Sequence, residues 1–344
     1  MNKEIKEKVK LLNEFGELTN PGYSTSLIQE YNRSDIKAKK FKIKEWDYYL
    51  IYNKDYAVAL TIDDNSYMGM ISASLINFKE IKEKTTSIIY PFTNGKTNMP
   101  STSKIGDIKV TKKKANIEFL NDGKSRILKL EMKKFDKEKD LKLEFTLTDE
   151  PNDSMVIATP FKENKKAFYY NQKIIGMKAE GYVLYGEEKI EFSKKDTLAL
   201  LDWGRGVWTY KNTWYWGAGH GYVDNKLIGF NIGYGFGDTS NATENMIFID
   251  GKAHKLDQVT FNIPKDTKGK DDYLKQWTFT SNDKRFEMDF TPIIDRKSKT
   301  DIGIICSDQH QVFGKFNGTL ILDDGSKIIL KNFIGFAEKV YNKW

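Results

Sequence analysis

The sequence feature that most constrains the fold is a two-residue alternation of side chains in short segments separated by turns. Segments 46–52 and 56–63 are rich in aromatic and β-branched residues, and Asn53-Lys54-Asp55 separates them. Asn-Asp-Gly at 121–123 and Asp-Asp-Gly at 323–325 are typical hairpin turns. Short strands with a turn about every ten residues are characteristic of sandwiches and barrels. We therefore predict an all-β fold of antiparallel strands.

The chain divides into two β halves in this interpretation. The first spans residues 1–197, and the second, residues 198–344, begins where the sequence becomes rich in Trp and Gly. We expect each half to be an antiparallel barrel or sandwich. Only residues 1–22 show a helical period, with Ile5, Val9 and Leu12 on one face, which makes a short N-terminal helix possible.

Composition excludes several classes of function. The net charge of +7 over 344 residues is mild, and the lysines form short runs beside acidic residues or turns, so nucleic-acid binding is not expected. Three scattered histidines and one cysteine, Cys306, show no metal-ligand spacing, so we expect no metal. No nucleotide-binding glycine loop or nucleophile elbow is present, and no cofactor is expected.

The apolar segments also constrain the location. None approaches the ~20 residues that span a bilayer, and the first residues lack the apolar stretch of a signal peptide. A cytoplasmic protein without an integral membrane span is the expectation, with its oligomeric state open.

Glycines alternate with bulky side chains in two neighbouring predicted strands. In segment 214–222 the glycines are 217, 219 and 221, and in segment 229–237 they alternate with Phe230, Ile232, Tyr234 and Phe236. Glycine inside a strand costs stability, so its repetition needs a reason. The bare faces either bend the sheet or let a large aromatic lie flat, or they make room for a ligand.

A polar constellation lies at Asp-Trp-Gly-Arg-Gly, residues 202–206. We predict a tight turn here, flanked by Asp202 and Arg205, which either form a buried salt bridge or converge on a ligand. A carboxyl group among aromatic rings loses solvation, so its pKa rises and it can donate a proton near neutral pH. Asp202 is therefore the candidate acid, with Arg205 as its positioning partner.

The candidate bases are His220, in the Trp-rich strand, and Glu244, which follows a polar loop. His220 has an ordinary pKa of ~6.5, although a lone histidine among aromatics is more often packed than catalytic. The side chains expected to bind the ligand are Trp203, Trp208, Trp214, Trp216, Asn231, Tyr234, Asn245 and His310.

Several of these segments carry a family resemblance. Leu201-Asp-Trp-Gly-Arg-Gly-Val-Trp208, Trp214-Tyr-Trp216, Thr243-Glu-Asn245 and His310-Gln-Val-Phe-Gly314 resemble the signature of a bacterial and fungal domain family of unknown function. That family is distantly similar to lipocalin-like two-domain proteins that include carotenoid 1,2-hydratase and some pericyclase-type enzymes. The resemblance implies two barrel-like halves with a cavity for an apolar ligand. It transfers no catalytic residue to this chain.

Three functions follow as hypotheses. The first is a cofactor-independent enzyme that hydrates, isomerises or cyclises a hydrophobic, isoprenoid- or lipid-like molecule with acid assistance. The second is a binding protein for an apolar ligand, without turnover. The third is a glycoside-active enzyme that uses Asp202 and Glu244 as its two carboxylates.

Overall fold

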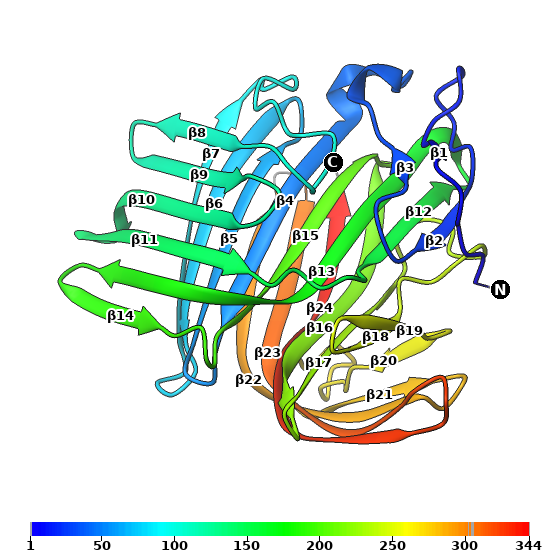
Figure 1. The fold of residues 1–344 in the computed structure, drawn as a ribbon. Helices are drawn as coiled ribbons and strands as arrows, with labels where there is room; N and C mark the ends of the chain where they lie inside the picture. The colour runs from blue at the N-terminus through cyan, green and yellow to red at the C-terminus, as the bar shows by residue number, and fades with distance from the viewer. Residues whose placement is uncertain (1, 302, 304–305, 344) are drawn as a thin grey trace.

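The computed structural model describes residues 2–301, 303 and 306–343 and confirms the all-β fold. Two curled antiparallel sheets, one of 13 strands and one of 9, form the two halves (Figure 1). A small parallel pair, β1 (Val9–Lys10) and β3 (Gln29–Glu30), lies apart from both. The described residues contain two short 3-10 helices, η1 (Arg33–Asp35) and η2 (Lys40–Lys42).

The first sheet runs in the order β7-β6-β5-β4-β15-β13-β11-β10-β9-β8, with β12 and β14 paired to β13 and β2 paired to β12. Its strands are β2 (Gly22–Ser24), β4 (Ile43–Tyr52), β5 (Tyr56–Asp64), β6 (Met68–Asn77), β7 (Lys82–Pro91), β8 (Ile108–Lys112), β9 (Ala115–Asn121), β10 (Arg126–Asp136), β11 (Lys139–Thr148), β12 (Met155–Phe161), β13 (Asn164–Tyr185), β14 (Glu188–Phe192) and β15 (Leu198–Val207).

The second sheet runs in the order β19-β18-β17-β16-β24-β23-β22-β21-β20. Its strands are β16 (Lys211–Val223), β17 (Lys226–Tyr234), β18 (Met246–Ile249), β19 (Lys252–Lys255), β20 (Val259–Asn262), β21 (Trp277–Ser281), β22 (Phe286–Asp301), β23 (Cys306–Ile321) and β24 (Lys327–Lys343).

The chain passes from one sheet to the other between Val207 and Lys211. The segment that the sequence analysis placed at the start of the second half, β15, is hydrogen-bonded between β4 and β13 in the first sheet. All ten of its residues are buried. A strand covered on both faces needs neighbours on both edges, which this position supplies.

The N-terminal helix is a wrong prediction, and Met1 lies outside the described residues. Residues 2–22 contain β1, isolated bridges, bends and a turn instead of a helix. Their backbone groups bond to other segments: the Lys3 amide donates to the Asn241 carbonyl, and the Ile5 amide to the Tyr23 carbonyl. Leu11 and Leu12 are both buried although they are adjacent in sequence. An isolated helix of this length is marginal in water, so pairing with existing strands prevails.

The turn predicted at residues 202–206 is also wrong, because these residues continue β15. Glycine serves close packing here instead of chain reversal. A Cβ atom placed on Gly204 would lie 1.9 Å from Cζ2 of Trp46, whose ring covers that position from β4.

The glycine-bare face of β16 receives aromatic rings, as one of the two explanations predicts. Gly219 pairs directly with Phe230 of β17, and a Cβ atom on Gly219 would lie 2.8 Å from the Phe230 ring. Phe333 lies against Gly221 in the same manner. The bare positions of β16 therefore let the aromatic core of the second half pack closely.

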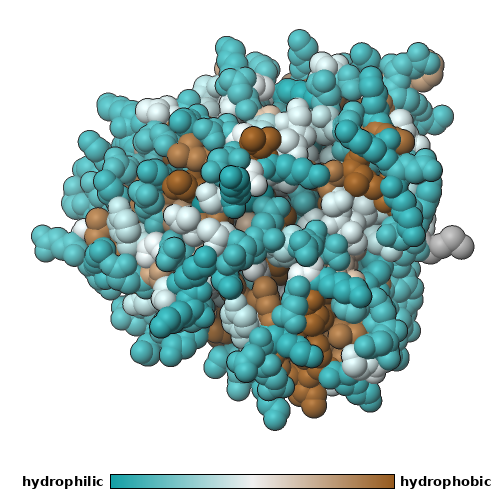
Figure 2. Space-filling model, viewed as in Figure 1, coloured by the Kyte–Doolittle hydropathy of each residue, from teal (hydrophilic) through white to brown (hydrophobic). Residues whose placement is uncertain are grey.

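Buried apolar side chains form two clusters. One extends through the first sheet into its contact with the second, and the other fills the second half around Phe230, Phe279 and Phe290. The face drawn in Figure 2 is mainly hydrophilic, with small hydrophobic patches. Among the described residues, no helix is long and apolar enough to cross a membrane.

The contact of Gly204 with Trp46 gives a first testable prediction. We expect Gly204→Ala to lower the free energy of unfolding by about 1–3 kcal/mol, the usual cost of overpacking a core. Urea denaturation measures this change. In a Trp46→Leu background the same substitution should be nearly neutral, because the ring is gone. An equal cost in both backgrounds would contradict the proposed clash.

Candidate functional site

Asp202 and Arg205 do not pair, which corrects the interpretation of residues 202–206. They are three positions apart on a strand, so their side chains leave opposite faces of the sheet. Oδ1 of Asp202 lies 2.8 Å from Nζ of Lys173 and accepts a hydrogen bond of 2.6 Å from Nδ2 of Asn171. Both partners belong to β13.

Arg205 is fully buried on the other face, inside the first half. Its Nη1 donates to Oδ1 of Asp47 at 2.9 Å and to the Trp46 carbonyl at 2.8 Å, and its Nη2 donates to the Pro100 carbonyl. Its guanidinium lies 4.2 Å from the ring centroid of Trp203. Arg205 and Trp203 therefore hold strands and a loop together within the first half.

Four charged side chains meet where the two sheets face each other, and we call them the interface cluster. They are Lys173 of β13, Asp202 of β15, Glu338 of β24 and Glu244, which precedes β18. Asp202 is bonded to Lys173, whose charge also acts on Glu244 and Glu338. The ammonium group of Lys173 thus acts on three buried carboxyl groups drawn from both halves of the molecule, with Arg296 also acting on Glu338 and Lys255 on Glu244.

Lys173 is placed by its contact with the second sheet. Its Nζ lies 3.7 Å from the ring centroid of Trp216 on β16, a cation–π contact across the interface. The same indole donates from Nε1 to Oδ1 of Asn231 at 2.7 Å. Trp216 and Asn231, both predicted ligand-binding residues, therefore border the cluster.

Glu338 is the carboxyl group best suited to hold a proton. Burial raises its pKa to about 7, although hydrogen bonds and the charges of Lys173 and Arg296 oppose the shift. Nε1 of Trp214 donates to one of its oxygens and Nε2 of Gln311 to the other, each at 3.0 Å. Neutral donors thus bond both oxygens, whereas Asp202 has an ammonium group 2.8 Å away.

Glu244 is held by the amide of Asn231, which donates to its backbone carbonyl at 2.8 Å and to Oε2 at 3.3 Å. Burial raises the pKa of Glu244, while Lys173 and the bond from Asn231 oppose the shift. Asn245 fixes the segment, because its Oδ1 accepts from the Gly233 amide at 2.6 Å. Asn245 is therefore a support for Glu244 within this structure.

The carboxyl residues of the interface cluster retain a small accessible fraction. Asp202, Glu244 and Glu338 keep 7, 9 and 7% of their surface accessible, whereas nearby Ala218 and Phe336 keep none. These three residues are therefore buried in the contact between the two sheets, with only a small part of their surface accessible.

An aromatic wall adjoins the cluster. It consists of Trp46, Tyr169, Trp208, Trp214 and Phe236, whose neighbouring ring centroids are 4.8–6.1 Å apart. Trp214 belongs to both groups, since its indole N–H bonds Glu338. Trp214 therefore links the aromatic wall to the interface cluster.

Three other predicted site residues lie apart from the cluster. His220 stacks on Tyr52 at 4.1 Å, four strand positions from Asp202 by register, and burial lowers its pKa to about 3. Tyr234 stacks on Tyr215 on the inner face of the second half. His310 bonds Asp295 at 2.7 Å and stacks on Tyr273.

Sequence reasoning missed half of the cluster, Lys173 and Glu338. It also missed three polar side chains that support them: Tyr48, Asn171 and Gln311. Asn171 and Lys173 interrupt the apolar segment 168–177, and that interruption was a usable signal. Glu338, inside an ordinary alternating strand, offered none.

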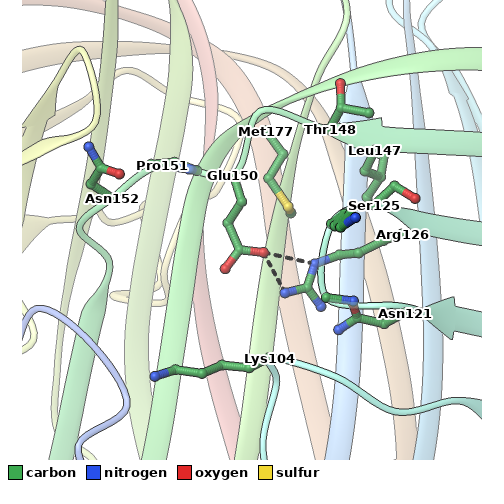
Figure 3. A pocket seen from close by; sticks show the side chains of 12 residues that line it. Lys104, Asn121, Ser125, Arg126, Leu147, Thr148, Glu150, Pro151, Asn152 and Met177 are labelled. Carbon is green, nitrogen blue, oxygen red and sulfur yellow. Dashed lines mark hydrogen bonds and ion pairs between the residues drawn. The ribbon is translucent and has the colours of Figure 1, made fainter.

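Two open pockets lie away from the cluster. One, of about 350 Å³, is lined by the turn between β9 and β10 and by residues 147–152, with Arg126 bonding Glu150 across it (Figure 3). The other, of about 460 Å³, lies beside β3 and shares Lys104 with the first. Neither contains a residue of the cluster. Among the described residues, no group of three or more His, Cys, Asp and Glu is arranged to hold a metal.

Comparisons with known proteins agree with this architecture. A family model described as a domain of unknown function, DUF2804, matches residues 2–344, which confirms the predicted family. No match was found among curated proteins.

Two solved structures share the fold. One, a candidate AttH from Nitrosomonas europaea, is 11% identical, with a TM-score of 0.58 over 90% of this chain and 96% of its own. The other, kievitone hydratase from Nectria haematococca, is 13% identical, with a TM-score of 0.51 over 98% of both chains. The expected likeness to two-domain lipocalin-like proteins is thus confirmed at the level of the fold.

The buried ion pair gives a second testable prediction. We expect Lys173→Met to cost about 3–5 kcal/mol of stability, because Asp202 would stay buried without its cation. The double variant Lys173→Met with Asp202→Asn should recover part of that loss. Urea denaturation of the wild type, both single variants and the double variant measures the coupling.

A matched exposed pair provides the control. Nζ of Lys142 lies 2.7 Å from a carboxylate oxygen of Glu131, and both side chains are more than half exposed. Lys142→Met should cost no more than about 1 kcal/mol. Equal costs at the two sites would show that the interface pair is no more than a surface contact.

Proposed function

The chain belongs to the DUF2804 family, and on that premise we propose that the interface cluster is the active site of an enzyme that protonates a hydrophobic, alkene-containing small molecule. The reaction class is hydration, isomerisation or cyclisation, and the proton comes from the protein's own side chains. The observation that carries the proposal is the placement of three buried carboxyl groups around one ammonium group, beside an aromatic wall.

Electrostatics assigns different roles to the carboxyl groups. Ionised carboxyl groups in one buried site repel one another, and burial disfavours their charged forms, so one group retains its proton near neutral pH in this proposal. Glu338, with its pKa raised to about 7, is the acid in this proposal. Asp202, paired with Lys173, is the carboxylate that faces developing positive charge. This assignment moves the acid from Asp202, its predicted position, to Glu338.

Hydration would begin with proton transfer from Glu338 to the alkene. The O–H bond of Glu338 breaks, and its proton forms a C–H bond at one alkene carbon while positive charge develops at the other. A water oxygen forms the new C–O bond there, and the proton it loses passes to Asp202 or Glu244. Isomerisation would use the same first step and return a proton from a neighbouring carbon to the carboxylate.

The comparison with kievitone hydratase supports the reaction class through the shared fold and the name of that protein. That protein is a hydratase on the same two-half architecture, at 13% identity. The carboxyl groups and the aromatic wall of this chain therefore carry the proposal.

Deuterium uptake is the direct test. The protein is incubated in D₂O with kievitone, farnesol and geranylgeraniol, and the recovered compounds are analysed by mass spectrometry. We expect deuterium on carbon, or addition of D₂O, for at least one compound, since protonation of an alkene transfers a solvent-derived proton. Stable binding without any label in any compound would favour the alternative of a binding protein without turnover.

Glu338→Gln tests the acid. An amide cannot donate the proton, so we expect turnover to fall by about 10²–10⁴-fold, the usual contribution of a general acid. Wild-type turnover should decline as the pH rises through about 7, where Glu338 loses its proton. Glu187→Gln, at an exposed turn, serves as the control and should leave both unchanged. Full activity in Glu338→Gln would remove Glu338 from the mechanism.

Stability provides a check that needs no substrate. The folded carboxyl group of Glu338 has a pKa of about 7, above its ordinary 4.5, so folding favours the protonated form. Its stabilising contribution is complete below pH ~4.5 and is lost as the pH rises through about 7. Wild-type stability should therefore decline relative to Glu338→Gln over this interval, as measured by urea denaturation at several pH values.

A further inference from the structure

A second polar group lies at the far side of the aromatic wall from Asp202. Lys44 of β4 is buried, and its Nζ is 4.9 Å from the ring centroid of Tyr67 and 5.4 Å from that of Trp208. Asp63 of β5 shares this face of the sheet, since it pairs with Trp46 in the register of β4 and β5. We call Lys44, Asp63, Tyr67 and Trp208 the lysine group.

Three buried polar atoms of the lysine group form no hydrogen bond. In the part of the chain that the structure describes, Oδ1 of Asp63, Oη of Tyr67 and Nε1 of Trp208 have no hydrogen-bond partner. Each such atom costs about 1–3 kcal/mol when it is left unpaired in a protein interior. Three of them in one place indicate a position built for a polar group that arrives from outside.

Burial disfavours the charged forms of the two ionisable residues in the lysine group, Lys44 and Asp63. Burial lowers the pKa of Lys44 to about 7, and burial also raises the pKa of Asp63 to about 7. Burial therefore disfavours the charged form of each group at this position. A neutral polar group suits such surroundings, because it requires no fixed charge for recognition.

The aromatic wall connects the lysine group to the interface cluster. Trp208 belongs to both the wall and the lysine group, and Trp214 joins the wall to Glu338. In the register of β15 with β4, Lys44 pairs with Gly206 and Tyr48 with Asp202. Lys44 and Tyr48 are four positions apart on β4, which corresponds to roughly 13 Å along the strand. A molecule that reaches from the lysine group to the interface cluster must therefore be longer than a single aromatic ring.

We propose that the lysine group binds a neutral hydroxyl or carbonyl oxygen of the substrate while its apolar body lies along the aromatic wall toward Glu338. This inference builds on the proposed function and narrows the substrate to amphipathic molecules with one oxygen-bearing end. The Tyr67 hydroxyl and the Trp208 N–H donate to the oxygen. Oδ1 of Asp63 accepts from the substrate when that end is a hydroxyl.

Binding, measured apart from turnover, tests the inference. Tryptophan fluorescence is titrated with farnesol, which has a terminal hydroxyl, and with farnesene, a hydrocarbon of the same carbon number. We expect farnesol to bind at least about tenfold more tightly, the effect of one or two buried hydrogen bonds. In Tyr67→Phe this preference should shrink several-fold with farnesene affinity unchanged, because only a hydroxyl is lost.

Tyr90→Phe is the matched control. Tyr90 also has a buried hydroxyl, but its ring lies against Lys112, and the strand register places it on the face of Asp64, opposite to that of Asp63. Its removal should leave both affinities unchanged. Lys44→Met provides a second variant at the site, with a thermal melt to establish that it folds.

The outcomes separate this inference from the proposed function. A preference for farnesol that depends on Tyr67 supports the lysine group even if no deuterium is ever transferred. Equal binding of farnesol and farnesene, or a preference that survives in Tyr67→Phe, overturns the inference. Deuterium transfer to farnesene, without any preference for the oxygenated compound, would support the proposed enzyme activity and contradict the proposed oxygen-binding role of the lysine group.

Discussion

The structure depends on β15, a strand buried on both faces between β4 and β13. Because successive side chains of a strand point to opposite faces, the segment Asp-Trp-Gly-Arg-Gly is divided by its own geometry. Asp202 faces the second sheet, and Arg205 faces the interior of the first half. One short motif therefore serves two purposes: its odd-numbered members hold the first half together, and Asp202 contributes to the site.

The interface cluster exists because neither half satisfies it alone. The first sheet supplies an ammonium group and one carboxylate, and the second half supplies Glu244, Glu338 and the indole that covers Lys173. Burying a charge is costly unless it is paired. The contact between the two halves therefore requires that the buried charges of the site are paired across it. All three carboxyl residues are buried in the contact between the halves.

The sequence predicted what local pattern determines. Alternation and the turns at 121–124 and 323–325 specified β9–β10 and β23–β24, and both hairpins are present. The pairing of β15 with β4 joins residues about 150 positions apart, which no local pattern encodes. Because the sequence does not reveal that residues 202–206 continue this paired strand, Asp202 and Arg205 were predicted to flank a turn and to form a pair or converge on one ligand. Glu338 was missed because a strand glutamate that faces a partner sheet has the same local sequence as one that faces water.

The position of β24 bears on synthesis at the ribosome. This strand follows β23 in the chain but lies between β16 and β23 in the sheet. Until residues 327–343 emerge, β16 has a free edge toward the centre of its own sheet, and a nascent chain exposes unpaired backbone groups there. The same strand brings Glu338. The strand that closes the second half therefore also completes the interface cluster, and a chain stopped at β23 lacks both.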